Sequence, residues 1–149
     1  MEKRLYLVDT CSFVQQFKNP DCAKLMDSLI LGGQFVFSAI VAMELYASTK
    51  DKQAKRSLDM LGTKLDEVGL LTTPTYNDYQ KAGIVLKNYS RRKGSVKSTT
   101  HFRDILICLS AIRAHAIIVT ENRTDFLRWA SEIKRSFNQN IAIFSWLEL

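Results

Sequence analysis

Short apolar runs alternate along the chain with longer segments in which apolar residues recur at helical spacing. Four of the runs are compact and rich in β-branched or aromatic residues, which is typical of buried strands. They lie at residues 5–8, 35–38, 116–120 and 141–144. Buried strands with helices between them predict an α/β protein in three layers, α/β/α, with a short, mainly parallel central sheet covered on both faces.

The segments between these runs predict helices, several with recognisable ends. Asn19-Pro20-Asp21 precedes one helix and Gly32-Gly33 ends it, while Ser38 is placed to cap the next. The expected helices span residues 12–17, 22–31, 39–48, 51–68, 76–93, 102–114 and 121–137. We find no linker or repeat, so the 149 residues predict a single domain, 1–149.

Parallel sheets of this kind bind ligands in the crevice outside the carboxyl ends of their strands. The four expected strands would end near residues 9–12, 38–44, 120–125 and 145–148. We therefore looked for isolated polar side chains in these stretches.

Two carboxylates stand alone in apolar surroundings near the first two strand ends. Asp9 is the only charged residue between Arg4 and Lys18, and Glu44 is the only charge on an otherwise apolar expected helix. Ionising a carboxyl group is costly in such surroundings. Asp9 could act as a helix cap, and Glu44 could form a salt bridge, although the next basic residue along the chain is Lys50.

Further candidates follow at Asp104 and after the third strand. Asp104 falls in the first turn of the helix expected over 102–114, where an acid also suits the helix dipole. Asn122 and Asp125 lie where the chain turns from strand to helix, and Thr124 could cap that helix. Each residue has a structural explanation when it is taken alone.

Taken together, four carboxylates at one sheet edge predict a bound cation, because like charges a few ångströms apart do not remain ionised without one. Carboxylate and water oxygens suit Mg²⁺ or Mn²⁺. Zinc is disfavoured, since the three Cys and two His show no ligand spacing. An acidic metal pocket in a chain of net charge +6 predicts a nuclease, in which the metal activates water and basic residues hold the nucleic-acid backbone.

A basic stretch leads to Asp104. Its members are candidate RNA contacts, and a solvated helix end explains them equally well; they are Arg91, Arg92, Lys97 and Arg103.

The segments "YLVDTCSF", "SAIVAMELYAS", "HFRDILICLSAI" and "IIVTENRTDF" resemble, in order and spacing, the four acidic motifs of PIN-domain ribonucleases, and in particular the VapC-type toxins of toxin–antitoxin pairs. The resemblance implies that Asp9, Glu44 and Asp104 are the core metal-site acids. It places the fourth position at either Asn122 or Asp125. It also implies that small hydroxyl residues bind water or phosphate near the metal, namely Thr10 and Thr120.

The same resemblance implies a PIN-like fold and a cofactor of Mg²⁺ or Mn²⁺. It implies cleavage of single-stranded RNA to a 3′-hydroxyl and a 5′-phosphate, a homodimer, and inhibition by a small antitoxin protein. We expect a cytoplasmic location without membrane association, because no apolar run approaches roughly 18 residues and the cysteines form no disulfide pattern.

Two other classes of protein are alternatives to the nuclease hypothesis. One is a catalytically inactive PIN-like module that binds RNA or protein, although such a module would be expected to lose its acids. The other is a phosphoryl-transfer or receiver domain, which requires further acids beside the first strand. The stretch "VDTCS" supplies only Asp9 there.

Overall fold

Five parallel strands form the central sheet of the computed structural model, which describes residues 2–94 and 98–149 apart from the side chains of residues 98–100. The spatial order of the strands is β3-β2-β1-β4-β5. Their bounds are β1 Leu5–Val8, β2 Phe35–Ser38, β3 Leu71–Thr72, β4 Ala116–Val119 and β5 Ile143–Phe144.

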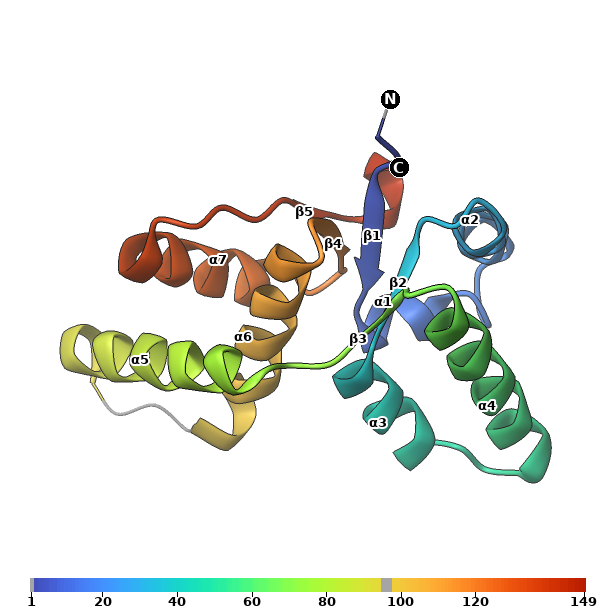
Figure 1. Cartoon of the computed structure of the whole chain (residues 1–149), viewed down its shortest axis with the longest axis horizontal. Coiled ribbons are helices and arrows are strands. Elements are labelled where there is room, and N and C mark those ends of the chain that lie inside the picture. Colours follow the sequence, from blue (N-terminus) through green and yellow to red (C-terminus); the bar gives the residue numbers. More distant parts are fainter. Residues whose placement is uncertain (1, 95–97) are drawn as a thin grey trace.

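Helices cover both sides of this sheet (Figure 1). Helices α5, α6 and α7 lie on one side, and α1 to α4 gather on the other. The helices are α1 Thr10–Gln15, α2 Pro20–Leu31, α3 Ala39–Ala47, α4 Lys52–Glu67, α5 Tyr76–Lys93, α6 Ser98–Arg113 and α7 Arg123–Phe137, followed by the 3-10 turn η1 Trp146–Glu148. The three-layer α/β/α fold class is confirmed. None of the helices in the described part of the chain is both long enough and apolar enough to cross a membrane.

The adjacent strands β1 and β4 are largely buried, which explains why they contain so few polar residues. Leu7 pairs with Ile118 and Val8 with Val119, and all four side chains are buried. Asp9 follows this pair of strands directly. The carboxylate of Asp9 therefore lies at the edge of the sheet, directly after a buried apolar segment.

Aromatic side chains pack against one another on each side of the sheet. On one side the Phe13 ring stacks on Phe37, with 6.2 Å between centroids. On the other side Trp129 is buried on α7 and contacts Tyr89 and His101, at 5.1 and 5.0 Å between ring centroids. The first contact joins α1 to β2, and the other two join α7 to α5 and α6.

The structure corrects three sequence expectations. The sheet has a fifth strand, β3, which was missed because two residues are too few to show a pattern. Helix α6 begins at Ser98, four residues before the expected start at 102. Asn122, and not Thr124, occupies the cap position of α7.

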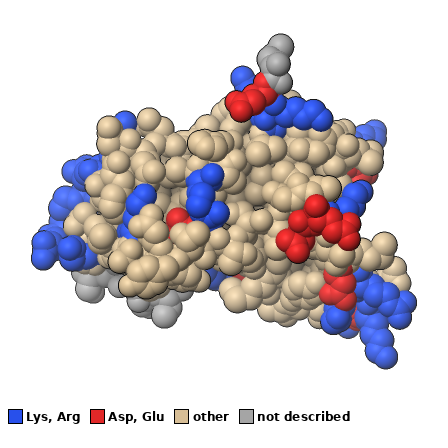
Figure 2. Space-filling view, in the orientation of Figure 1, with Lys and Arg blue, Asp and Glu red and all other residues tan. Residues whose placement is uncertain are grey.

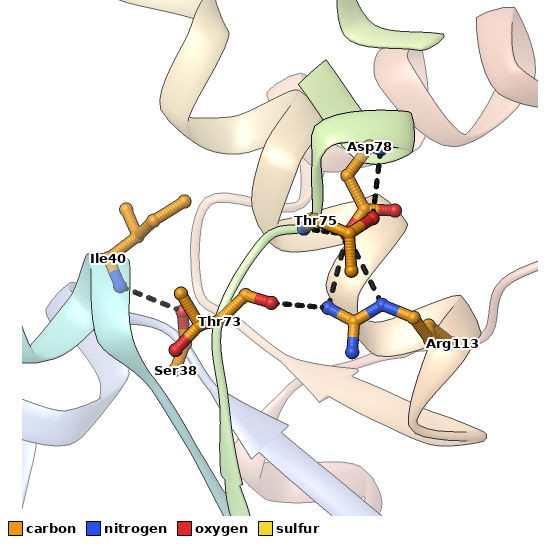
Figure 3. Close-up of polar contacts among 6 residues, drawn as sticks. All are labelled: Ser38, Ile40, Thr73, Thr75, Asp78 and Arg113. Atoms are coloured by element: carbon orange, nitrogen blue, oxygen red, sulfur yellow. Dashed lines mark hydrogen bonds and ion pairs between the residues drawn. The ribbon is translucent and has the colours of Figure 1, made fainter. Parts of the chain in front are cut away.

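An arginine at the end of α6 ties this helix to the start of α5 (Figure 3). Arg113 contacts the carboxylate of Asp78 at 3.1 Å and donates to the Thr73 carbonyl at 2.7 Å. Asp78 and Thr75 also form a capping box at the start of α5. This network fixes α6 through contacts at its carboxyl-terminal end.

A second ion pair joins α5 to α7. The Arg92 guanidinium contacts the carboxylate of Glu132, whose side chain is only 7% exposed. Figure 2 shows Lys and Arg gathered at the end of the molecule formed by these two helices, and both helices carry basic residues in their last turns. Arg92 therefore has an intramolecular partner in addition to the RNA role predicted for it.

Replacing Arg92 with Met should lower the free energy of unfolding by about 1–3 kcal/mol, because the buried Glu132 carboxylate would lose its partner. Urea unfolding at neutral pH measures the change. Arg91→Met, at the exposed neighbouring position, is the matched control and should change stability by less than about 0.5 kcal/mol. Equal losses in the two variants would show that the ion pair contributes nothing to the α5–α7 contact.

Candidate functional site

The carboxylate of Asp9 is buried at the end of β1, with 4% of the residue exposed. One oxygen accepts a hydrogen bond from the Ser12 backbone N–H at 2.9 Å, which caps α1. The other accepts from the Thr120 hydroxyl at 2.5 Å. Burial raises the pKa of Asp9 above its ordinary value, and these hydrogen bonds oppose the rise. The capping role that the sequence allowed is therefore present, together with a contact that reaches across to the end of β4.

A chain of polar contacts continues from Thr120 to the start of α7. The Thr120 hydroxyl oxygen accepts from the Asn122 backbone N–H at 3.0 Å, and the Asn122 side-chain amide donates to Asp125 at 3.1 Å. Arg128, one turn further along α7, lies 3.5 Å from the same carboxylate of Asp125. The turn after β4 thus places Asn122 and Asp125 side by side.

Thr10 follows Asp9 in the chain and opens α1. Its hydroxyl oxygen is buried and, among the described residues, has no hydrogen-bond partner. Buried hydroxyls normally have a partner. The role in water or phosphate binding that the resemblance implied for Thr10 remains a prediction.

Glu44 lies on α3, whose first turn is capped by the Ser38 hydroxyl, which accepts from the Ile40 N–H at 3.2 Å (Figure 3). The Glu44 side chain is 23% exposed and contacts the guanidinium of Arg103 at 3.2 Å. No basic residue near Glu44 in the sequence suggested such a partner. Arg103 comes from α6 and could not be identified from local spacing.

The pKa of Asp104 is affected by the charges of the other three predicted acids. Asp104 lies in the second turn of α6, so the helix-dipole explanation that the sequence left open for it is wrong. Burial raises its pKa to about 6, with further contributions from the charges of Asp125, Asp9 and Glu44, in that order of size after burial. Arg103 lowers it. Four carboxyl groups from four different elements therefore act on one another at the carboxyl edge of the sheet.

The oxygen donors at this edge are of the kind that Mg²⁺ and Mn²⁺ prefer. In residues 2–94 and 98–149, however, no three Asp, Glu, His or Cys side chains are grouped closely enough to hold a metal ion. Two of the four acids lie beside arginines, Glu44 beside Arg103 and Asp125 beside Arg128. The donor set fits a hard divalent ion in chemical type, and binding would require these side chains to turn.

The predicted RNA contacts divide into separate groups. Arg103 lies at the acids, and Arg91 and Arg92 lie at the end of α5, where Arg92 is paired with Glu132. Lys97 lies outside the described residues. Arg128 was not singled out from the sequence, although its spacing of three residues from Asp125 on a helix was a usable signal.

Several solved structures share this fold, among them chains of the following three complexes. A chain of FitAcB from Neisseria gonorrhoeae superposes with a TM-score of 0.63 at 18% identity, over 97% of this chain and 100% of that one. A chain of VapBC2 from Rickettsia felis, bound to a DNA fragment from their promoter, superposes with a TM-score of 0.63 at 22% identity, over 95% of this chain and 98% of that one. A chain of DNA-bound VapBC from Salmonella typhimurium superposes with a TM-score of 0.61 at 19% identity, over 97% of this chain and 99% of that one.

These identities are low, and the similarity shows the fold. It is the fold of chains from VapBC complexes, so the PIN-like architecture implied by the sequence resemblance is confirmed. A scan against models of protein families and a search of curated proteins each found no match.

The raised pKa of Asp104 predicts a pH-dependent cost in stability. An ordinary aspartate has a pKa of 3.8, against about 6 for Asp104 in the folded chain, so the folded protein binds more protons in this window. Ionisation of Asp104 therefore destabilises the fold as the pH rises through it. Asp104→Asn cannot ionise, and its stability relative to the parent should rise from about pH 4 to 6 and then level off. The gain should reach about 1–2 kcal/mol after allowance for solvent screening.

Thermal unfolding of parent and variant in EDTA, between pH 4 and pH 8, measures this difference. A difference that does not change with pH would contradict the raised pKa. A variant that is less stable than the parent at every pH would assign Asp104 a structural role.

Proposed function

We propose that this chain is a metal-dependent endoribonuclease and the toxin of a toxin–antitoxin pair. The observation that carries the proposal is the convergence of the other three predicted acids on Asp104, a half-buried carboxyl whose pKa is raised first by burial and then by the charges of Asp125, Asp9 and Glu44. Convergent carboxylates that destabilise one another are typical of sites whose charge is balanced by a ligand. Glu44 and Asp125 each lie beside an arginine, but in the part of the chain that the structure describes Asp9 and Asp104 form no salt bridge, whereas a purely structural network would pair these two carboxylates with cations as well.

In this proposal Asp9, Glu44 and Asp104 hold Mg²⁺ or Mn²⁺. The ion, when bound, polarises the phosphodiester and lowers the pKa of the attacking water. The catalytic group is completed by Asp125, either directly or through water, and Asn122 orients it through their hydrogen bond.

The two threonines would act on oxygens next to the acids. Thr120 already donates to Asp9 and so fixes the orientation of that carboxylate. Thr10 has a buried hydroxyl without a partner among the described residues, and we assign to it a water or phosphate oxygen.

The substrate in this proposal is RNA, single-stranded or structured. Arg103 lies beside the acids and would contact the phosphate nearest to the reaction, and Arg91 would contact a more distant one. The net charge of +6 supports attraction to a polyanion.

We propose an antitoxin partner because the chains that share this fold come from complexes named FitAcB, VapBC2 and VapBC. Two of these complexes are bound to DNA, which in one of them is a promoter fragment. A small antitoxin protein, a homodimer of this chain and a cytoplasmic location belong to the same proposal.

Cleavage of a panel of short RNAs in Mg²⁺, in Mn²⁺ and in excess EDTA tests the proposed activity. We expect cleavage in either metal, none in EDTA, and a loss of at least roughly 100-fold in Asp9→Asn prepared in parallel, since ligand-level changes in metal sites have effects of this size or larger. RNA binding without cleavage in any metal would replace the enzyme with an inactive binding module. Undiminished cleavage in EDTA would refute the metal assignment.

The two candidates for the fourth position should separate in metal affinity. Asp125→Asn removes a charge and should weaken Mn²⁺ binding by roughly tenfold as well as lowering activity. Asn122→Ala removes no charge, so it should lower activity while leaving Mn²⁺ affinity close to that of the parent. Calorimetric titration and cleavage rates on the same preparations provide both readouts. If Asp125→Asn matches the parent in both, the site consists of three carboxylates.

A further inference from the structure

The ion pair between Arg103 and Glu44 joins two helices that both contribute acids to the candidate site. Arg103 Nη1 lies 3.2 Å from Glu44 Oε1, and the two side chains are 49% and 23% exposed. Glu44 is one of the residues that would bind the metal ion. Its carboxylate cannot present both oxygens to a metal while it is held by the guanidinium.

The ion pair is not needed to hold α6 in place. Exposed pairs of this kind contribute about 0–1 kcal/mol to stability. Helix α6 has a separate attachment, since Arg113 binds both Asp78 and the Thr73 carbonyl. A role in the site explains the position of Arg103 better than a role in the fold.

We propose that Arg103 is an internal counterion that competes with the divalent ion for Glu44. Without metal its guanidinium neutralises Glu44 and separates this carboxylate from the other acids. When the ion binds, Arg103 is released at the mouth of the site, where it can bind an RNA phosphate. This inference rests on the proposed function, and it adds to that function a regulation of metal binding.

The other acids are consistent with this exchange. Among the described residues Asp9 and Asp104 form no salt bridge, so no arginine or lysine there competes with an ion for these two carboxylates. Arg128 lies beside Asp125 at 3.5 Å, a longer contact within one helix, and is expected to compete less strongly.

This exchange of partners by Arg103 would also couple the binding of metal to the binding of RNA. A phosphate that binds Arg103 would withdraw it from Glu44 and so raise the affinity of the site for metal. By thermodynamic reciprocity, bound metal would raise the affinity for RNA by the same factor. Metal and RNA would then bind to the site cooperatively.

Titration of the full chain with Mn²⁺, followed by calorimetry, tests the competition without any measurement of cleavage. Arg103→Gln should bind Mn²⁺ roughly two- to fivefold more tightly than the parent, which corresponds to the strength of an exposed ion pair. The matched control is Arg123→Gln. Arg123 opens α7 next to Asn122, but its partner, at 2.6 Å, is Glu148, which is not one of the four acids.

The outcomes distinguish the possible failures. If Arg103→Gln matches the parent, or if Arg123→Gln tightens binding as much, the effect of Arg103 is absent or is only a general electrostatic one, and the proposal is overturned. An Arg103→Gln variant that does not fold would make the pair a structural clamp and would also overturn it. If the parent binds neither Mn²⁺ nor Mg²⁺, the proposed function itself fails.

A second comparison places the competition at Glu44. In a Glu44→Gln background the added Arg103→Gln change should leave Mn²⁺ affinity nearly unaltered, because the carboxylate that it competes for is gone. A gain as large as in the parent background would contradict direct competition.

Discussion

The buried carboxylate of Asp9 is the interaction on which the rest of the site depends. It follows a strand whose last two residues, Leu7 and Val8, are buried, and two hydrogen bonds hold it, from Ser12 and from Thr120. The first opens α1, and the second reaches the neighbouring strand β4. The position of one carboxylate therefore sets the start of a helix and the geometry of the turn that carries Asn122 and Asp125.

The negative charges of the four acids lie close enough together to disfavour the ionised form of Asp104. Asp9 and Asp125 lie beyond the ends of the neighbouring strands β1 and β4, and helices α3 and α6 carry Glu44 and Asp104. Burial raises the pKa of Asp104, and the charges of the other three acids raise it further. The chain reduces the repulsion with its own cations at two of the four acids, Glu44 and Asp125, through Arg103 and Arg128.

Other ion pairs have a different function because they lie away from this edge. Arg113 with Asp78 and Arg92 with Glu132 join helices of one layer, and each uses a carboxylate that is 7% exposed. The pairs at the acids are more exposed, with Glu44 at 23% and Asp125 at 37%. Buried pairs resist exchange, whereas exposed ones are accessible to an entering ion or phosphate.

The sequence by itself determined the central strands, most helices and the choice of Asp9, Glu44 and Asp104 as unusual carboxylates. These conclusions depend on local patterns, because a charge isolated in an apolar run is visible without the fold. Tertiary structure alone decided the pairing of Glu44 with Arg103, the partner of Arg92 and the existence of β3. Each of these joins residues far apart in the chain, and local periodicity carries no information about which distant side chain will meet a given charge.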